Sequence, residues 1–176
     1  MDILSGIRVA DFSRVWAGPY CSMMLGELGA EIIKIEAPGV GDETRVWPPF
    51  YKERSGYFMS FNRSKKSLTL NLKDPRGHDI ALDLIRKSDV LLENFTPGVT
   101  ERLKLDYPAV SKENPDLIYC SISAFGQTGP YGNRRGYDPI LQAMSGIMSV
   151  TGEPDRPPVR VGIATADLSG GVFSAF

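Results

Sequence analysis

The chain has 176 residues, of which 42% are hydrophobic, 10% aromatic and 23% charged, a composition typical of globular proteins and not of disordered ones. Its 20 basic and 21 acidic residues give a formal net charge of -1, which excludes the strongly basic surface of a nucleic-acid-binding protein. Its apolar runs fall short of the roughly 18 residues that read as a membrane-spanning helix.

The N-terminus lacks a secretory pattern, since Asp2 is acidic and further charges interrupt the first apolar stretch. We therefore expect a cytoplasmic protein that binds neither membranes nor nucleic acids. Cys21, Cys120 and the single His78 are far apart in sequence and have no metal-ligand spacing. No metal site is expected.

The chain begins with a strand, a helix and a second strand. Arg8–Phe12 is a short apolar run that predicts a strand, and Gly18-Pro19 opens a helical pattern that stops at Gly29. We expect the buried face of this helix to carry Tyr20, Met23, Met24 and Leu28. Glu31–Glu36 is the next predicted strand. A helix between two strands within about 30 residues predicts a parallel pair.

Residues 37–56 are rich in Gly and Pro and predict a long loop, a kind of segment that is uncommon unless functional. Next comes a basic cluster whose usual interpretation is a solvated turn, made of Arg63, Lys65, Lys66 and Lys73. Ser67–Leu72 alternates and predicts a strand. Asp74-Pro75 predicts the start of a helix that runs to about Lys87, with Ile80 and Leu84 on its buried side.

The second half continues the alternation. Strand patterns cover Asp89–Phe95 and Leu117–Ser123. Helices are predicted at Val99–Leu103, Tyr107–Glu113, Tyr137–Ile147 and Thr165–Phe176, with turn-rich loops at Phe125–Gly136 and Thr151–Pro158. The whole pattern predicts an α/β fold with a Rossmann-like parallel sheet and flanking helices, as one domain over 1–176. Because no cap follows the last helix, we expect the N-terminal part of a longer protein.

Three places in the sequence are candidates for chemistry. The loop Ser13–Pro19 precedes a helix, where backbone N–H groups suit phosphate, but it has no GxGxxG or P-loop pattern and fits a tight turn with a packed Trp16 equally well. Asn94 and Arg102 bracket a Pro-Gly turn, where a locally satisfied Asn is the default. Asp167 stands among small residues at a helix start, which suits either a capping carboxylate or a nucleophile.

Taken together, six segments in order resemble the class III CoA-transferases, also called the CaiB/BaiF or formyl-CoA transferase family. They are Gly6–Arg45, Asn62–Gly77, Asp89–Val99, Ile118–Pro130, Arg134–Gly146 and the ATADLSGG segment that contains Asp167. The resemblance implies the N-terminal part of the family's large domain. For the full-length protein it implies a homodimer whose chains interlock.

The resemblance also implies an activity, the transfer of CoA from an acyl-CoA thioester to a small carboxylic acid. Asp167 matches the family nucleophile, which forms a mixed anhydride and then an aspartyl-CoA thioester. CoA or acyl-CoA is then a substrate, and no tightly bound cofactor is expected. Family members supply part of the oxyanion stabilisation from a Gly-rich loop outside this sequence.

The CoA contacts that the resemblance implies are Trp16, Ala17, Ala37, Leu70, Asn71, Leu72, Lys73, Asn94, Phe95, Thr96, Arg102, Arg135, Gly136, Tyr137 and Asp138. Many members carry Gln where Trp16 stands, and some carry Arg where Ala37 stands. On the acyl side the implied residues are Trp16, Trp47 and Tyr137. Trp47 matches a gating aromatic, and simple loop packing is its alternative.

Two other functions stay open on the sequence. The related α-methylacyl-CoA racemases move an α-proton with a His–Asp pair, but their histidine is missing at Gly136–Tyr137, which favours the transferase. The second alternative is a catalytically inert CoA-binding fragment in which Asp167 only caps a helix. Oxalate or formate, succinate, carnitine and aromatic acids all remain open as substrates.

Overall fold

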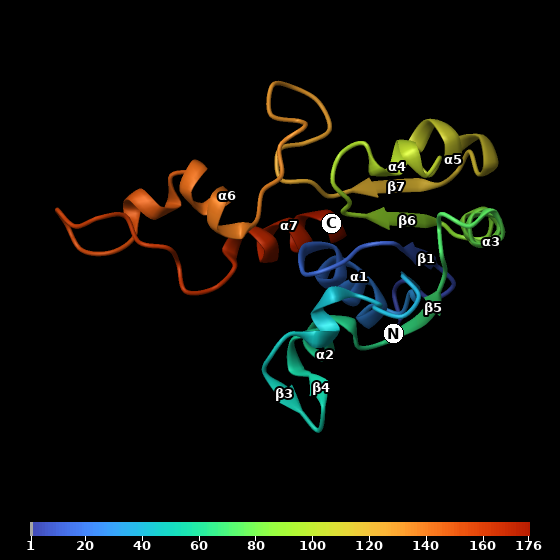
Figure 1. The fold of residues 1–176 in the computed structure, drawn as a ribbon, viewed down its shortest axis with the longest axis horizontal. Helices are drawn as coiled ribbons and strands as arrows, with labels where there is room; N and C mark the ends of the chain where they lie inside the picture. The colour runs from blue at the N-terminus through green and yellow to red at the C-terminus, as the bar shows by residue number, and fades with distance from the viewer. Residues whose placement is uncertain (1) are drawn as a thin grey trace.

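A five-stranded parallel sheet forms the centre of the computed structural model, which describes residues 2–176 (Figure 1). Its strands are β1 (Arg8–Asp11), β2 (Glu31–Glu36), β5 (Lys65–Thr69), β6 (Val90–Glu93) and β7 (Ile118–Ser121), in the spatial order β5-β2-β1-β6-β7. Every neighbouring pair is parallel, and Arg8 is level with Glu31 in the first pair. The predicted α/β fold and its parallel first pair are confirmed.

The strand order reverses between β1 and β6. From β1 the chain moves outward to β2 and β5, and then it crosses back to β6 on the other side of β1. In doubly wound sheets the loops that leave the carboxyl ends of such a strand pair diverge and open a crevice. The loops after Asp11 and after Glu93 are those loops here.

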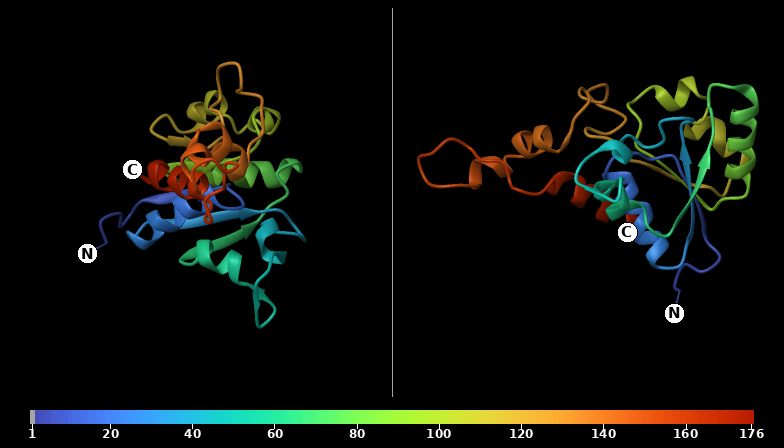
Figure 2. Two further views of the ribbon diagram at one scale, coloured as in Figure 1. Left: turned by 90° about the vertical axis from the view of Figure 1, so that its left-hand side faces the viewer. Right: turned by 60° about the horizontal axis from the view of Figure 1, so that its bottom comes forward.

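Helices cover the two faces of the sheet (Figure 2). One face packs on α3 (Pro75–Arg86) and α5 (Tyr107–Glu113), and the other packs on α1 (Ala17–Glu27) and α7 (Thr165–Ala175). Successive strand residues divide between the two apolar cores, because side chains alternate across a strand. Ala10 and Leu91 belong to the first core, and Val9 and Leu92 belong to the second.

The predicted long loop over 37–56 is wrong. It contains a 3-10 helix η1 (Glu43–Val46) and a small hairpin of β3 (Phe50–Tyr51) and β4 (Arg54–Ser55), and it leads into helix α2 (Gly56–Asn62). Side-chain caps start both helices. Asp42 accepts a hydrogen bond from the Thr44 N–H, and Ser55 Oγ accepts one from the Phe58 N–H.

The basic cluster is only partly the solvated turn that its pattern indicates. Strand β5 begins at Lys65, two residues before the predicted start, because Lys65–Thr69 pairs with Ile32–Glu36. Lys66 lies on the solvent side with 74% of its side chain exposed, whereas the Lys65 side chain is 2% exposed. An ion pair at the buried end, described below, makes that burial possible.

Both predicted helix faces are shifted by neighbouring elements. Helix α1 buries Pro19, Cys21, Ser22 and Met23, while Leu28 is exposed, because the helix packs on the sheet and on α7 together. Helix α3 buries Gly77, Ala81 and Ile85. Its buried face is thus displaced by one residue from the predicted face with Ile80 and Leu84, and Ile80 is 48% exposed. The predicted Asp74 cap is confirmed, since its side chain accepts the Arg76 N–H at 3.0 Å.

The C-terminal part leaves the body of the molecule and returns. Helix α6 (Asp138–Met144) and the 3-10 helix η2 (Ile147–Val150) precede a long loop, and α7 then runs back alongside α1, whereas the short helix α4 (Val99–Arg102) lies in the body next to α5 (Figures 1 and 2). The helix predicted over Tyr137–Ile147 therefore ends early, at Met144, and Gly146 with φ of 84° separates it from η2. Over residues 2–176 no helix is long and apolar enough to cross a bilayer.

Candidate active site

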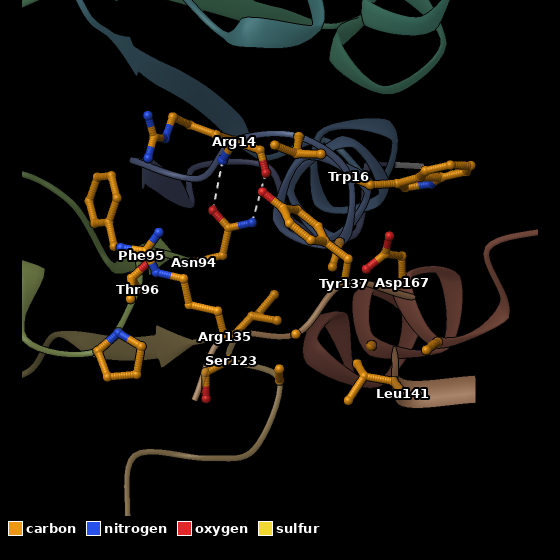
Figure 3. Close-up of a pocket in the computed structure, with 18 of the residues that line it drawn as sticks. Arg14, Trp16, Asn94, Phe95, Thr96, Ser123, Arg135, Tyr137, Leu141 and Asp167 are labelled. Carbon is orange, nitrogen blue, oxygen red and sulfur yellow. Dashed lines mark hydrogen bonds between the residues drawn. The ribbon is translucent and has the colours of Figure 1, made fainter. Parts of the chain in front are cut away.

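A pocket of about 440 Å³ opens at the point where the strand order reverses. Its walls come from the loop after β1, the loop after β6, the segment between β7 and α6, and the first turns of α7. These segments are far apart in the sequence, and the fold brings them to one edge of the sheet (Figure 3). The pocket is therefore placed where doubly wound sheets bind their ligands.

Nine of the residues implied by the family resemblance line this pocket. They are Trp16, Ala17, Asn94, Phe95, Thr96, Arg135, Gly136, Tyr137 and Asp167. The same wall also contains three charged residues that no sequence pattern predicts as site residues, Arg14, Glu43 and Arg134. Their signal is weak, because Arg14 and Arg134 lie in irregular segments, Glu43 begins the short helix η1, and none of the three belongs to a motif of its own.

Asn94 joins the two loops that diverge from the sheet. Its Oδ1 accepts the Arg14 N–H at 2.8 Å, and its Nδ2 donates to the Arg14 carbonyl at 2.7 Å (Figure 3). The Arg14 guanidinium lies over the Phe95 ring at 5.3 Å. The Asn94 amide is thus satisfied by the backbone of a residue 80 positions away, and not by its own turn as the turn pattern indicates, and it ties the two loops together at the pocket.

A buried ionic network that the sequence did not predict supports the loop after β1. Asp11 is fully buried, accepts hydrogen bonds from the Ser13 N–H at 2.9 Å and from Ser22 Oγ at 2.6 Å, and lies 3.3 Å from Lys65 Nζ. Burial raises the pKa of Asp11, but the nearby Lys65 and Lys34 ammonium groups and the hydrogen bonds from Ser13 and Ser22 together hold that pKa below its usual range.

The network continues to the next loop through Lys34. Its Nζ donates to the Ser13 carbonyl at 2.7 Å and lies 2.9 Å from the Asp42 carboxylate, although both side chains are almost fully buried. Two neighbouring loops are thereby tied to one ammonium group. In the sequence, the one sign of this network is Lys34 itself. A lysine in the middle of the predicted strand Glu31–Glu36 is unexpected, because lysine is rarely buried without a partner.

Asp167 stands in the first turn of α7, where its carboxylate faces the pocket. The N-cap of α7 is Ala164, so among the described residues Asp167 is not the cap, but it is a first-turn carboxylate, which suits the positive end of the helix. Burial, reinforced by the Asp138 carboxylate, raises the pKa of Asp167 to about 6. A poorly solvated carboxylate without a donor of its own has the character that nucleophilic attack requires.

Helix α7 reaches this position because it packs closely on α1. An added Cβ at Gly171 would lie 2.8 Å from the Ala17 carbonyl oxygen and 3.0 Å from the Tyr20 ring, so only glycine fits. Ala17 is also a pocket residue. The small residues after Asp167 therefore serve to bring its helix up to the loop after β1.

An aromatic cluster lies beside the pocket. The Trp16 ring contacts Tyr57 at a centroid distance of 5.0 Å and Phe61 at 4.9 Å, and Trp47 contacts Tyr57 at 5.3 Å. Trp47 is not part of the pocket lining, so its observed contact is packing against Tyr57. Burial and the nearby Asp167 and Asp138 carboxylates raise the pKa of Tyr57 to about 12. Tyr57 is not among the predicted site residues, because helix α2 was not expected, and the one sequence signal of that helix is its Ser55 cap.

The remaining implied CoA contacts lie outside this pocket. Ala37 follows β2, and residues 70–73 follow β5, so both come at the carboxyl edge of the sheet. Leu70 is buried in the core, Leu72 packs against it, and Lys73 is exposed. Arg102 is exposed on α4. The last two residues of the set, Asn71 and Asp138, are engaged in hydrogen bonds with the protein itself. Asn71 Oδ1 accepts a hydrogen bond from the Lys73 N–H. The buried Asp138 carboxylate accepts one from the Ala166 N–H of α7 and one from the Gln142 side chain of α6.

Residues 2–176 hold no group of three or more His, Cys, Asp or Glu that could bind a metal ion. His78 lies on α3, away from the pocket lining. Cys21 and Cys120 are both free thiols.

Comparison with known proteins identifies the family. A profile of CoA-transferase family III matches residues 4–176. The chain belongs to this family. A solved structure of a CaiB/BaiF family protein from Brucella suis superposes on it with a TM-score of 0.93 at 42% identity, covering 98% of this chain and 47% of that one.

Curated relatives of this chain are named for specific substrates. A succinyl-CoA:glutarate CoA-transferase of Mus musculus is 51% identical over 99% of this chain, and an acetyl-CoA:oxalate CoA-transferase of Acetobacter aceti is 52% identical over 96%. The chain spans 40% and 43% of the length of these relatives.

Proposed function

We propose that the protein transfers CoA from an acyl-CoA thioester to a small carboxylic acid, with Asp167 as the covalent nucleophile. The observation that carries this proposal is the Asp167 carboxylate, which faces the pocket with no hydrogen-bond donor and with its pKa raised to about 6. At neutral pH most of this carboxylate is ionised, and its attack on a thioester needs little desolvation.

The reaction conserves the thioester in four substitutions at carbonyl carbon. An Asp167 oxygen attacks the donor thioester, and CoA leaves as its thiolate, which gives an aspartyl–acyl anhydride. The thiolate then attacks the Asp167 carbonyl carbon and releases the donor acid as its carboxylate. The acceptor carboxylate attacks the aspartyl-CoA thioester and displaces the thiolate again. A last attack of the thiolate on the acceptor's carbonyl forms the new acyl-CoA and restores Asp167.

The carboxyl edge of the sheet suits a long, anionic substrate. Lys73 and Arg102 would hold phosphate groups of CoA by charge-assisted hydrogen bonds, as the family resemblance implies. Arg135 and Tyr137 line the pocket next to Asp167, which suits the thioester end. This arrangement supports a CoA molecule that extends from the loop after β5 to the nucleophile.

The acid substrates that we propose are small dicarboxylates. Support comes from the names of the relatives, which act on succinate, glutarate or oxalate, and from the arginines of the pocket wall, which suit a second carboxylate. Trp47, packed on Tyr57 beside Trp16, would close the acyl side of such a site. Dimerisation of the full-length protein and a cytoplasmic location stay predictions.

The racemase alternative lacks support in the pocket. Proton abstraction next to a thioester needs a base with a near-neutral pKa and a partner acid across the substrate. The single histidine lies on α3, and the residue before Asp138 is Tyr137. The pocket does contain the carboxylate that transfer would need as its nucleophile.

The substitution Asp167→Asn tests the proposal in the complete protein. Transfer of CoA from succinyl-CoA to glutarate should fall by at least about 10³-fold, because the amide cannot form the anhydride. The affinity for CoA should stay within about 3-fold, since no CoA contact is removed, and the exposed Asp79→Asn on α3 should leave both unchanged. Full transfer by Asp167→Asn would overturn the proposal.

A further inference from the structure

The Asp138 carboxylate connects α6 to the start of α7. Its Oδ1 accepts the Ala166 N–H at 2.8 Å, and its Oδ2 accepts a hydrogen bond from Gln142 Nε2 at 2.7 Å. The residue is 3% exposed. Since Ala166 directly precedes Asp167, the bond fixes the backbone at the proposed nucleophile.

Gln142 completes the connection from the next turn of α6. Its Oε1 accepts the Val161 N–H at 2.8 Å, and its Nε2 donates to the Ile163 carbonyl at 3.0 Å as well as to Asp138. The side chain is 1% exposed. Three backbone groups between 161 and 166 are thus held by two buried side chains on one helix.

Among residues 2–176, Asp138 is the one side chain that accepts a hydrogen bond from a backbone N–H in the first turn of α7. The N-cap Ala164 has no side-chain oxygen, so the first N–H groups of α7 depend on other residues. The segment between η2 and α7 has no regular structure of its own. Tyr137, on the pocket wall, directly precedes Asp138. The wall and the nucleophile are therefore joined through these two side chains.

We infer that Asp138 and Gln142 form a positioning clamp, which holds the Asp167 carboxylate at a fixed place against the Tyr137 side of the pocket. This inference rests on the proposed function and deepens it. Neither side chain needs to touch the substrate. A shift of about 1 Å in a reacting group can cost about 100-fold in rate, so the clamp acts on the rate of attack.

The clamp also places a second carboxylate near the nucleophile. The titratable and charged groups around Asp167 are Asp138 on α6, Tyr57 on α2, and the pocket residues Arg14, Glu43, Arg134, Arg135 and Tyr137. Asp138 is the charge that raises the pKa of Asp167 beyond the effect of burial. Loss of this charge should shift the pH dependence of Asp167 to lower pH.

Two variants of the complete protein test the clamp. For Gln142→Ala we expect kcat for CoA transfer to fall about 10- to 100-fold with KM for succinyl-CoA within about 3-fold, and the Val161 N–H to exchange with deuterium about 10-fold faster. For Asp138→Asn we expect the acidic limb of the pH–rate profile to move to lower pH. Labelling of Asp167 by a carbodiimide, followed by peptide mass spectrometry, should show the same movement without any turnover.

Asn114→Ala is the matched control, because Asn114 Nδ2 donates to the Ile85 and Ser88 carbonyls far from the pocket. It deletes a similar amide clamp and should leave kcat unchanged. The inference is overturned if Gln142→Ala speeds exchange but lowers kcat no more than Asn114→Ala does. If the wild type transfers no CoA, the proposed function fails, and an unmoved carbodiimide profile in Asp138→Asn would separately overturn the clamp.

Discussion

At the scale of single residues, Asp167 is held in a place that does not favour its ionised form. Burial and the Asp138 charge raise its pKa from 3.8 to about 6, so the folded state binds a proton that the unfolded state has already released. The loss of folding stability that this raised pKa causes is absent below about pH 4, grows between about pH 4 and 6, and is complete above about pH 6. Pre-organised active sites commonly carry such a cost.

This cost predicts that Asp167→Asn stabilises the protein while it removes activity. We expect the free energy of unfolding to rise by about 1–2 kcal/mol at pH 7, a range reduced for the partial exposure of the carboxylate. At pH 3.5 the difference from wild type should vanish. Urea unfolding of the variant and the wild type at both pH values measures this difference. A variant that is no more stable than the wild type at pH 7 would contradict the buried, unfavourable environment of the Asp167 carboxylate.

Lys65 is a second buried charge: burial lowers its pKa to about 8, but its partners still require the ammonium group at neutral pH. Its ammonium group donates hydrogen bonds to the Asp11 carboxylate, the Pro19 carbonyl and Asn62 Oδ1 at distances of 2.9–3.3 Å. Removing one member of a buried ion pair leaves the other charge without compensation, which costs far more than the loss of a surface pair.

We therefore expect Lys65→Met to lower the free energy of unfolding by about 3–5 kcal/mol. The neighbouring Lys66→Met removes a surface pair with Glu31 and should cost less than about 1 kcal/mol. If Lys65→Met fails to fold, the double variant Asp11→Asn/Lys65→Met should recover part of the loss. Equal effects of the two lysines in urea unfolding would contradict the network.

At the scale of elements, the contact between α1 and α7 decides where the nucleophile lies. The two adjacent glycines of α7 face different surroundings. An added Cβ at Gly171 meets the Ala17 carbonyl, whereas one at Gly170 meets only the Ala17 Cβ at an ordinary 3.9 Å. The chain offers a matched pair of substitutions for this contact.

Gly171→Ala should lower the free energy of unfolding by about 1–3 kcal/mol, because the helix must move away from α1. Gly170→Ala should be neutral or raise it by up to about 1 kcal/mol, since alanine favours a helix over glycine. Thermal or urea unfolding of both variants measures the difference. A similar result for both would show that α7 does not depend on this close packing.

Most of the elements could be predicted from the sequence, and the exceptions have physical causes. The alternation of apolar runs with capped helices identifies all five strands of the main sheet, because burial patterns and caps are local. The α2 region was missed because two helix caps, Asp42 and Ser55, lie among Gly and Pro residues. The buried faces of α1 and α3 depend on neighbours far along the chain, which local periodicity does not contain.

At the scale of the whole molecule, the pocket exists only because the sheet reverses its strand order between β1 and β6. The resemblance to the family brought together nine residues that do line this pocket, while the residues alone gave only separate candidates. The polar network of Asp11, Lys34 and Lys65 and the pair Asp138–Gln142 could not be predicted. Each depends on side chains from different strands or helices that meet only in the folded chain.

The most direct test of the account is a trap of the covalent intermediate in the complete protein. The enzyme is mixed with succinyl-CoA or acetyl-CoA, hydroxylamine is added, and the peptides are mapped by mass spectrometry. Hydroxylamine attacks the activated Asp167 carbonyl and displaces CoA thiolate, so the account predicts a hydroxamate at Asp167 and none in Asp167→Asn. Turnover of the thioester into a new acyl-CoA without any adduct at Asp167 would contradict it.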